Sequence, residues 1–173
     1  MNSSLQYLSF KKLLIPFCLF IFPELFCIPI YAQEHPPKPI TVTVSVLQHL
    51  NFGTIIPNGA GGGTVTVDFT GLRTYTGQII LPATGTFSSP ALFQITAIPG
   101  TLITIINGTP ANISGSNGGS LLLTIGSSST GSPFITTGTI TDVFIGGTLT
   151  VGSLISNPAG AYNGTFDVTF VQQ

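Results

Sequence analysis

The feature that most constrains this chain is a strict alternation of branched apolar residues with hydroxyl residues. Over residues 40–46, isoleucine or valine occupies every second position, and threonine or serine fills the positions between them. Residues 64–69 repeat the pattern. Successive side chains of a β-strand point to opposite faces, so a period of two predicts strands with one buried face. In the second segment this places Val65, Val67 and Phe69 on one face.

Further runs of apolar and β-branched residues predict more strands, and glycine, proline and asparagine residues separate them. All 21 glycines follow residue 32, and no stretch has the 3.6-residue period of an amphipathic helix. The sequence therefore predicts an all-β fold, a single antiparallel β-sandwich that is immunoglobulin-like or pilin-like. The further strands are expected near 50–56, 78–82, 91–97, 102–107, 120–125, 139–145, 147–152 and 162–171, with turns at 57–59, 99–100, 107–108, 117–119, 146–147 and 157–158.

The first 32 residues differ in composition from the rest and predict an export signal. Lys11 and Lys12 precede an apolar run over residues 13–22, and the segment ends at Ala32. This order of charged region, apolar region and small exit residue is typical of a secretory signal peptide, so we expect cleavage after Ala32. The expected organisation is a signal peptide at 1–32, a proline-rich lead at 33–39 and a β-sandwich domain at 40–173.

A retained membrane anchor is the alternative for the same segment. Residues 13–32 could cross a bilayer once, although the Glu24 carboxylate near their middle would cost about 2.5–3.5 kcal/mol to insert. Both cysteines, Cys18 and Cys27, lie in this segment, and neither follows the small residue of a lipid-attachment signal. After cleavage the chain would have no disulfide and no thiolate nucleophile. Its expected location is then the periplasm, the cell surface or the medium, with no membrane span left.

Charged residues are scarce throughout the chain. They make up 5% of it, against about 25% in typical soluble proteins. Without a basic patch, nucleic acid is not expected as a partner. Threonine, serine and asparagine must therefore form much of the surface. Such a surface suits a protein that is packed into an assembly, and solvation by hydroxyl and amide groups explains the same composition.

No arrangement of residues in the sequence predicts catalysis. The glycine-rich loop 59–64 lacks the lysine and the following helix of a phosphate-binding loop, so we expect a flexible connection between strands. His35 and His49 lack the spacing of a zinc site. Asp68 and Asp142 are expected to be solvated strand carboxylates rather than an acid–base pair. The sequence therefore predicts a protein that is not an enzyme, with no catalytic residue, no cofactor and no metal site.

Six phrases occur in order along the predicted domain: LNFGTIIP from Leu50, GGGTVTV from Gly61, TGQIIL from Thr76, ALFQI from Ala91, IGGTLTVG from Ile145 and NPAGAYNGTF from Asn157. Together they resemble a bacterial family of secreted proteins classed as domain of unknown function 4402, over essentially all of residues 38–173. The resemblance implies an envelope protein of a Gram-negative bacterium, with some relatives described as fimbrial-subunit-like. It brings no catalytic residues with it.

A second resemblance concerns the two ends of the predicted domain. Residues 40–46 are similar to the N-terminal donor strand of fimbrial major subunits of the colonisation-factor type, and residues 160–170 are similar to their closing strand. The resemblance implies donor-strand complementation, in which this strand completes the sandwich of a neighbouring subunit. Pairing of the strand within its own chain is the alternative. The donor residues would be the four branched apolar residues of the strand, Ile40, Val42, Val44 and Val46.

Two functions follow as expectations. The first is a non-enzymatic structural protein of the cell envelope or surface, a fimbrial-type subunit with copies of itself, other envelope proteins and a periplasmic chaperone as partners. The alternative is a self-contained secreted or envelope sandwich that binds glycan or protein through its loops. A hydrolase with an unrecognised site is a third and weaker reading.

Overall fold

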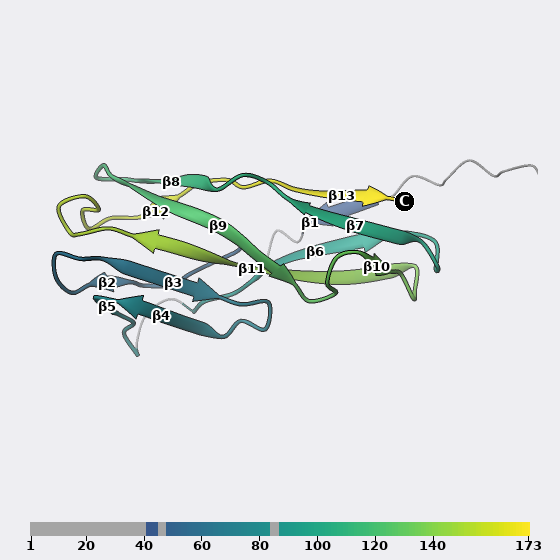
Figure 1. Ribbon diagram of the computed structural model, residues 1–173, viewed down its shortest axis with the longest axis horizontal. Coiled ribbons are helices and arrows are strands. Elements are labelled where there is room, and N and C mark those ends of the chain that lie inside the picture. The colour runs from purple at the N-terminus through teal and green to yellow at the C-terminus, as the bar shows by residue number, and fades with distance from the viewer. Residues whose placement is uncertain (1–40, 45–47, 84–86) are drawn as a thin grey trace, which may run out of the picture. The chain divides into compact units, whose positions relative to one another are not determined.

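The computed structural model describes residues 41–44, 48–83 and 87–173, and for residues 41–44 it describes the backbone alone. The signal peptide, the proline-rich lead, Ile40 and Val46 lie outside the described residues. The described chain forms strands, turns and loops without any helix (Figure 1). Accordingly, this part of the chain offers no helix long and apolar enough to cross a membrane.

All strand pairs are antiparallel and belong to three sheets, which confirms the all-β sandwich predicted from the sequence. The eight-stranded sheet runs in the order β1 (Thr41–Val44), β6 (Ala91–Thr96), β11 (Ile140–Val151), β9 (Ser120–Ser128), β8 (Ala111–Gly115) and β12 (Tyr162–Asn163), with β3 (Gly63–Val67) beside β11 and β4 (Arg73–Gly77) beside β3. The three-stranded sheet comprises β10 (Phe134–Ile135), β7 (Leu102–Asn107) and β13 (Val168–Gln172), and the two-stranded sheet comprises β2 (Ile56–Pro57) and β5 (Ile79–Ile80).

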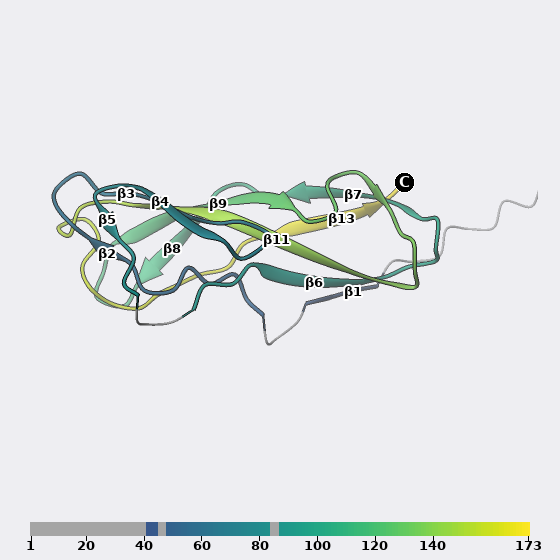
Figure 2. The same cartoon turned by 90° about the horizontal axis from the view of Figure 1, so that it is seen from below.

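The three-stranded sheet packs over the β6 end of the large sheet. Figure 2 shows β7 and β13 in one layer and β6 and β1 in the other. Between the layers, the Phe93 ring of β6 meets the Phe170 ring of β13 at a centroid distance of 5.4 Å. The buried side chains of this first half of the core are Ala91, Phe93, Ile95, Ile103, Phe134, Val143 and Ile145.

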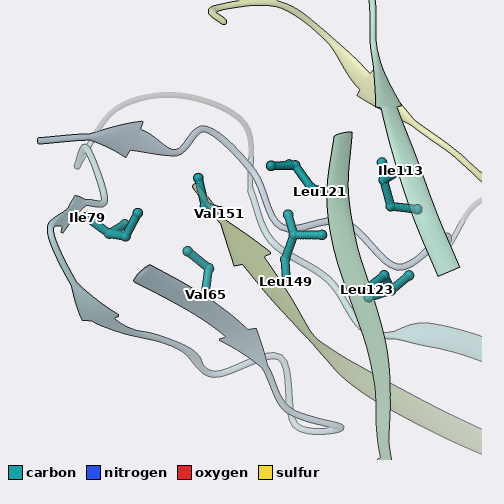
Figure 3. Close-up of a cluster of buried hydrophobic side chains, with 7 residues drawn as sticks. All are labelled: Val65, Ile79, Ile113, Leu121, Leu123, Leu149 and Val151. Atoms are coloured by element: carbon teal, nitrogen blue, oxygen red, sulfur yellow. The ribbon is translucent and has the colours of Figure 1, made fainter. Parts of the chain in front are cut away.

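A second group of buried side chains fills the other half of the sandwich (Figure 3). It is continuous with the first half, because Leu50, Ile125 and Phe166 pack against both groups. The buried members are the branched aliphatic residues Val65, Ile79, Ile113, Leu121, Leu123, Leu149 and Val151. Val65 and Val67 are both fully buried, as their alternation predicts. Phe69 was expected on the same face, but β3 ends before it and its side chain is 36% exposed.

β11 runs through both halves, and the turn predicted at residues 146–147 is wrong. The strand pairs first with β6, as far as Ile145 opposite Ala91, and then with β3, from Gly147 opposite Val67. Glycine at position 146 serves close packing rather than a turn, since a Cβ there would collide with the backbone oxygen of Val67. The two strands predicted at 139–145 and 147–152 are therefore one strand that changes partners.

Polar strands account for most of the other differences. β4 and β8 were not predicted, because threonine, asparagine, serine and glycine make up much of their sequences. Conversely, the apolar stretch 50–56 is mostly irregular, with an isolated bridge from Asn51 to Ser89 and only the start of β2. The strand predicted at 162–171 is divided into β12 and β13.

Candidate assembly interface

β1 is the outermost strand of the large sheet, and β6 is its one partner among the described strands. The register sets Val42 opposite Ile95 and Val44 opposite Phe93. Ile95 is fully buried and Phe93 is 8% exposed. Directly opposed residues of an antiparallel pair share one face of the sheet. Val42 and Val44 therefore occupy register positions of the core face.

The hydroxyl residues of β1 occupy the alternate register positions. Thr41 is opposite Thr96, which is exposed, and Thr43 is opposite Gln94. The side chain of Gln94 lies on the outer face, where its Nε2 donates to the Asp142 carboxylate at 3.1 Å. The pattern of alternation in the sequence thus agrees with the two faces of the β1–β6 pair.

The chain beyond β1 is fixed to the same strand in a different register. Val44 is opposite Phe93. Leu92, which precedes Phe93 in β6, donates its N–H to the carbonyl of Gln48 at 3.2 Å, although the register of β1 would set it opposite the residue directly after Val44. Asn51 and Ser89 then exchange two backbone hydrogen bonds of 2.8 and 2.9 Å. Residues 48–51 therefore hold the chain against β6 and its lead-in independently of β1.

The opposing layer has an open edge at this end. β13 pairs with β7 and with no other strand in the described part of the chain. The apolar side chains of Val168 and Phe170 on β13, and of Phe166 just before it, are only partly buried. Phe166 also meets Phe93, at a centroid distance of 6.5 Å in an edge-on arrangement. The core between β6 and β13 is thus covered by β1 on one layer and is incompletely covered on the other.

Such an arrangement can do one thing by its chemistry, which is to bind an extended chain. An edge strand presents unpaired backbone N–H and C=O groups, and a strand with apolar residues at alternate positions satisfies them while filling the core. β1 supplies this complement within its own chain. A second copy could supply the same residues in the same register.

The sequence predicted the pattern of this strand and missed its surroundings. Phe93, which is opposite Val44, lies far from β1 in the chain, and so does Phe170, whose ring contacts that of Phe93 from the other layer. Both contacts depend on long-range pairing. The alternate positions of Phe166, Val168 and Phe170 in the sequence were the available signal, because they mark an apolar stripe at the end of the chain. No local pattern indicates which strand lies across from that stripe.

Asp68 lies in a turn rather than on the strand where it was expected. It follows the end of β3, and its Oδ1 accepts hydrogen bonds from Thr70 N at 2.8 Å, Thr70 Oγ1 at 2.6 Å and Leu72 N at 2.9 Å. These bonds fold the chain back into β4. One oxygen of the carboxylate is thus engaged in the turn, which corrects the placement of Asp68 on the strand.

The other polar candidates are dispersed over the surface. Asp142 is exposed on β11, as predicted, and accepts a hydrogen bond from Gln94. His49 is exposed, and its backbone carbonyl accepts a hydrogen bond from Ser89 Oγ at 2.9 Å. His35 lies outside the described residues. No group of three or more potential metal ligands occurs within the residues that the structure describes.

The glycine-rich loop joins β2 to β3, so it connects two strands as expected, and it is tied down by hydrogen bonds. Gln78 Oε1 accepts from Gly61 N at 2.8 Å, and Gln78 N donates to Gly62 O at 2.8 Å. A Cβ at Gly62 would collide with the backbone oxygen of Val151. The glycines at these positions allow close packing, and the expectation of a merely flexible connection missed that role.

Comparison with known proteins gives one match. A family model described as Domain of unknown function (DUF4402) matches residues 40–171. The chain matches no curated protein and no solved structure closely enough to indicate a relationship.

Proposed function

The chain belongs to the DUF4402 family, a domain of unknown function, and from the geometry of β1 we propose that it is a non-enzymatic structural subunit of the bacterial cell surface or envelope. Copies of the chain assemble by donor-strand complementation. In the assembled state, β1 of one copy pairs with β6 of the next copy. A periplasmic chaperone would hold the acceptor edge until assembly.

The position of β1 carries this proposal. The strand is the outermost of its sheet and covers β6 alone among the described strands. Behind β6 lie Phe93 and Ile95, which belong to the core. A strand at this position can be exchanged for the same strand of another copy without altering any other pair of the large sheet.

The energetics also support exchange. Burying one aliphatic side chain contributes about 1.5–3 kcal/mol, so the four branched residues of the strand would contribute about 6–12 kcal/mol before ordering costs. The same contacts form in either copy. The free energy of exchange is therefore set by strain in the connecting segment and by the entropy of association, and a closed monomer can be the precursor of the polymer.

The experiment compares the two faces of β1. Replacement of Val42 and Val44 by Asp should abolish polymers, because each carboxylate would have to enter the apolar core without a partner. Replacement of Thr41 and Thr43 by Asp should leave the polymers intact, since these positions lie on the outer face of the β1–β6 pair. Polymers are detected as ladders in unboiled SDS gels of envelope fractions, and light scattering gives the mass of the purified protein.

A deletion of residues 34–46 supplies the control. The truncated protein should not polymerise and should still accept a synthetic peptide of that sequence. The proposal is wrong if the wild type is a monomer at every concentration and both pairs of substitutions merely lower its melting temperature. In that case β1 is a strand of its own chain alone.

A specific loop favours the alternative, a self-contained sandwich that binds glycan or protein. Between β11 and β12 the buried Asn157 donates to Ser120 O at 2.7 Å and accepts from Gly152 N. The loop so anchored presents Leu154 at 51% and Ile155 at 94% exposure. A monomeric wild type whose melting temperature rises with a ligand, and rises less when both residues are replaced by Ser, would favour this function.

A further inference from the structure

β4 is the outer strand of the branch in which β3 pairs with β11, so its outer side is a rim of the large sheet. Two hydrogen bonds fix the pattern of its pairing with β3. At one end Asp68 N donates to Leu72 O at 3.1 Å, and at the other Gln78 N donates to Gly62 O at 2.8 Å. Both pairs have the register of the β3–β4 ladder, and they lie just beyond its two ends. In an antiparallel ladder, hydrogen-bonded pairs alternate with pairs that are not bonded.

The alternation determines which backbone groups of β4 are free. Counting inward from either end, Thr74 and Thr76 are hydrogen-bonded to β3. Arg73, Tyr75 and Gly77 therefore direct their N–H and C=O groups away from β3, towards the rim. β4 has no second partner strand in the described part of the chain. Three alternate residues of β4 thus direct their N–H donors and C=O acceptors towards the rim.

The side chains of this rim are unusual for an edge strand. Tyr75 is opposite Val65 and so shares the core face, yet it is 54% exposed where Val65 is fully buried. On the outer face, the hydroxyl of Thr76 shares a hydrogen bond of 2.7 Å with that of Thr64. Edge strands that avoid pairing carry lysine, inward-pointing charge or proline. Residues 74–77 carry none of these, and Arg73 at the start of β4, opposite the buried Val67, is the one charge on the core face of the strand.

We propose that β4 pairs with β4 of a second copy of this chain, antiparallel and about a twofold axis at Tyr75. In this register Tyr75 faces the partner's Tyr75, Thr74 faces the partner's Thr76, and Arg73 faces the partner's Gly77. All three outward residues of each copy then enter hydrogen-bonded pairs. If the register shifted by one residue, the outward N–H and C=O groups of one copy would face residues of the other copy whose groups already bond to β3.

The sequence of β4 is complementary to itself in this register. Thr74 meets the partner's Thr76 as Thr64 meets Thr76 within the chain, so the row of paired hydroxyls continues across the dimer. Arg73 meets a glycine, which offers no side chain to obstruct it, and the two guanidinium groups are not opposed. The guanidinium is already held by its own chain, where Nη1 donates to Phe52 O at 2.9 Å. The two half-exposed tyrosine rings would cover each other.

This pairing is independent of the proposed function, because β1 and β4 lie at different rims of the sheet. Isologous pairing through β4 produces a closed pair of copies. Strand exchange through β1 produces a chain of copies. Variants at residue 75 should alter the molecular mass of the closed pair, and variants at residues 42 and 44 should alter that of the polymer. Light scattering distinguishes the two modes in this way.

Single cysteines test the register. The full chain is expressed with Cys18→Ser and Cys27→Ser, so that an introduced cysteine is its one thiol, and the protein is purified from the envelope. Opposed residues of a hydrogen-bonded pair have Cα atoms about 5.5 Å apart, within reach of a disulfide, and diagonal neighbours are about 7–8 Å apart. Tyr75→Cys should form a covalent dimer under mild oxidation. Thr74→Cys should not, except when mixed with Thr76→Cys.

Proline tests the hydrogen bonds. Tyr75→Pro removes an N–H that points to the rim and leaves the ladder with β3 intact, which is the one setting in which a sheet tolerates proline. Two intermolecular hydrogen bonds are lost per dimer, so the dimer dissociation constant should rise about tenfold or more. Tyr75→Thr, the matched control, lacks the ring and keeps the N–H, and it should weaken the dimer less. Light scattering over a dilution series measures each constant.

The proposal predicts a dimeric mass for the wild type, with or without the polymer ladders of β1. It is overturned if the variant that lacks residues 34–46, which cannot polymerise through β1, is monomeric. Equal crosslinking of Tyr75→Cys and Thr74→Cys would also overturn it, since random collision does not select a register. Should Tyr75→Pro fail to fold by circular dichroism, the cysteine pair alone decides.

Discussion

Asp68 is the residue whose charge is most closely engaged by its neighbours. The hydroxyl of Thr70 is the main cause that lowers the pKa of its carboxyl below the ordinary value of 3.8, and desolvation opposes the shift. Backbone N–H groups of Leu72, Thr70 and Gly71 lower the pKa further. The ionised form is thus favoured in the folded protein over the unfolded chain.

A pH dependence follows from this shift. Because the folded pKa is the lower one, the ionised carboxyl stabilises the fold at neutral pH, and the gain disappears as pH falls through 3.8 and then through the folded value. Asp68→Asn should therefore lower the urea midpoint at neutral pH and lower it less at about pH 2. Thr70→Val is the control, since it keeps the carboxyl and removes its strongest donor. An equal loss at both pH values for Asp68→Asn would contradict the shift.

The role of Asp68 illustrates a limit of the sequence pattern at single positions. The alternation of Val65, Val67 and Phe69 continues the strand past its real end, and Asp68 then reads as an outward strand residue. The turn competes locally through the Asp68 side chain, which bonds to backbone N–H groups two and four residues ahead. Aspartate two residues before a threonine and three before a glycine was the signal for that turn.

Among the elements, β11 depends on glycine for its change of partners. A Cβ at Gly146 would lie 2.8 Å from Asp68 Cα and would collide with the backbone of Val67. Both obstacles are main-chain atoms of β3 and its turn, so they cannot move as a side chain can. The close approach of β3 to β11 at this point requires glycine.

Gly146→Ala should therefore destabilise the fold by about 1–3 kcal/mol, the usual range for overpacking a buried position. Gly138→Ala is the matched control, because its nearest neighbour would be Ile140 O at 3.6 Å and its backbone does not need glycine. Urea unfolding of the two variants measures the difference. A Gly146→Ala variant as stable as Gly138→Ala would show that β3 can shift away from β11.

The sequence predicted elements well where one face is apolar, and poorly elsewhere. The apolar run 102–107 coincides with β7, and 91–97 with β6. β4 escaped prediction because its neighbour β3 supplies the apolar contact and β4 itself has a polar, exposed sequence. Local patterns report the burial of a strand, and they do not report a strand that exists mainly by hydrogen bonding to another.

At the scale of the whole described domain, the two halves of the core share side chains. Leu50, Ile125 and Phe166 each pack against both groups of buried residues. β11 adds a continuous backbone connection between the halves. The halves should therefore unfold as one cooperative unit.

Hydrogen exchange can check this cooperativity. Ile103 is fully buried in the half that contains β7. Ile103→Val removes one methylene and should cost about 1 kcal/mol. If unfolding is global, exchange of the slowest amides in β3, in the other half, should accelerate about fivefold, as in β7. Acceleration confined to β7 would show two separately unfolding parts.

The candidate interface was predictable in its strand and not in its setting. The alternation over residues 40–46 predicts a strand with one apolar and one hydroxyl face, and the register of β1 agrees with that prediction. Whether such a strand serves its own chain or another copy is not encoded in the alternation, because either pairing makes the same contacts with β6. The free rims at β13 and β4 depend on the order of strands in space, which a local pattern does not specify.

The tightly packed glycines have a consequence for how distant members of the family can be recognised. As such chains diverge, valine, isoleucine and leucine can replace one another on the core face of the strands for less than about 1.5 kcal/mol each. Gly63 and Gly146 have no substitute, because a Cβ at either would collide with main-chain oxygen atoms, of Thr76 and Val67 respectively. A pair of glycines held at this separation, each beside an alternating strand, should outlast the rest of the sequence and act as the most durable marker of common descent.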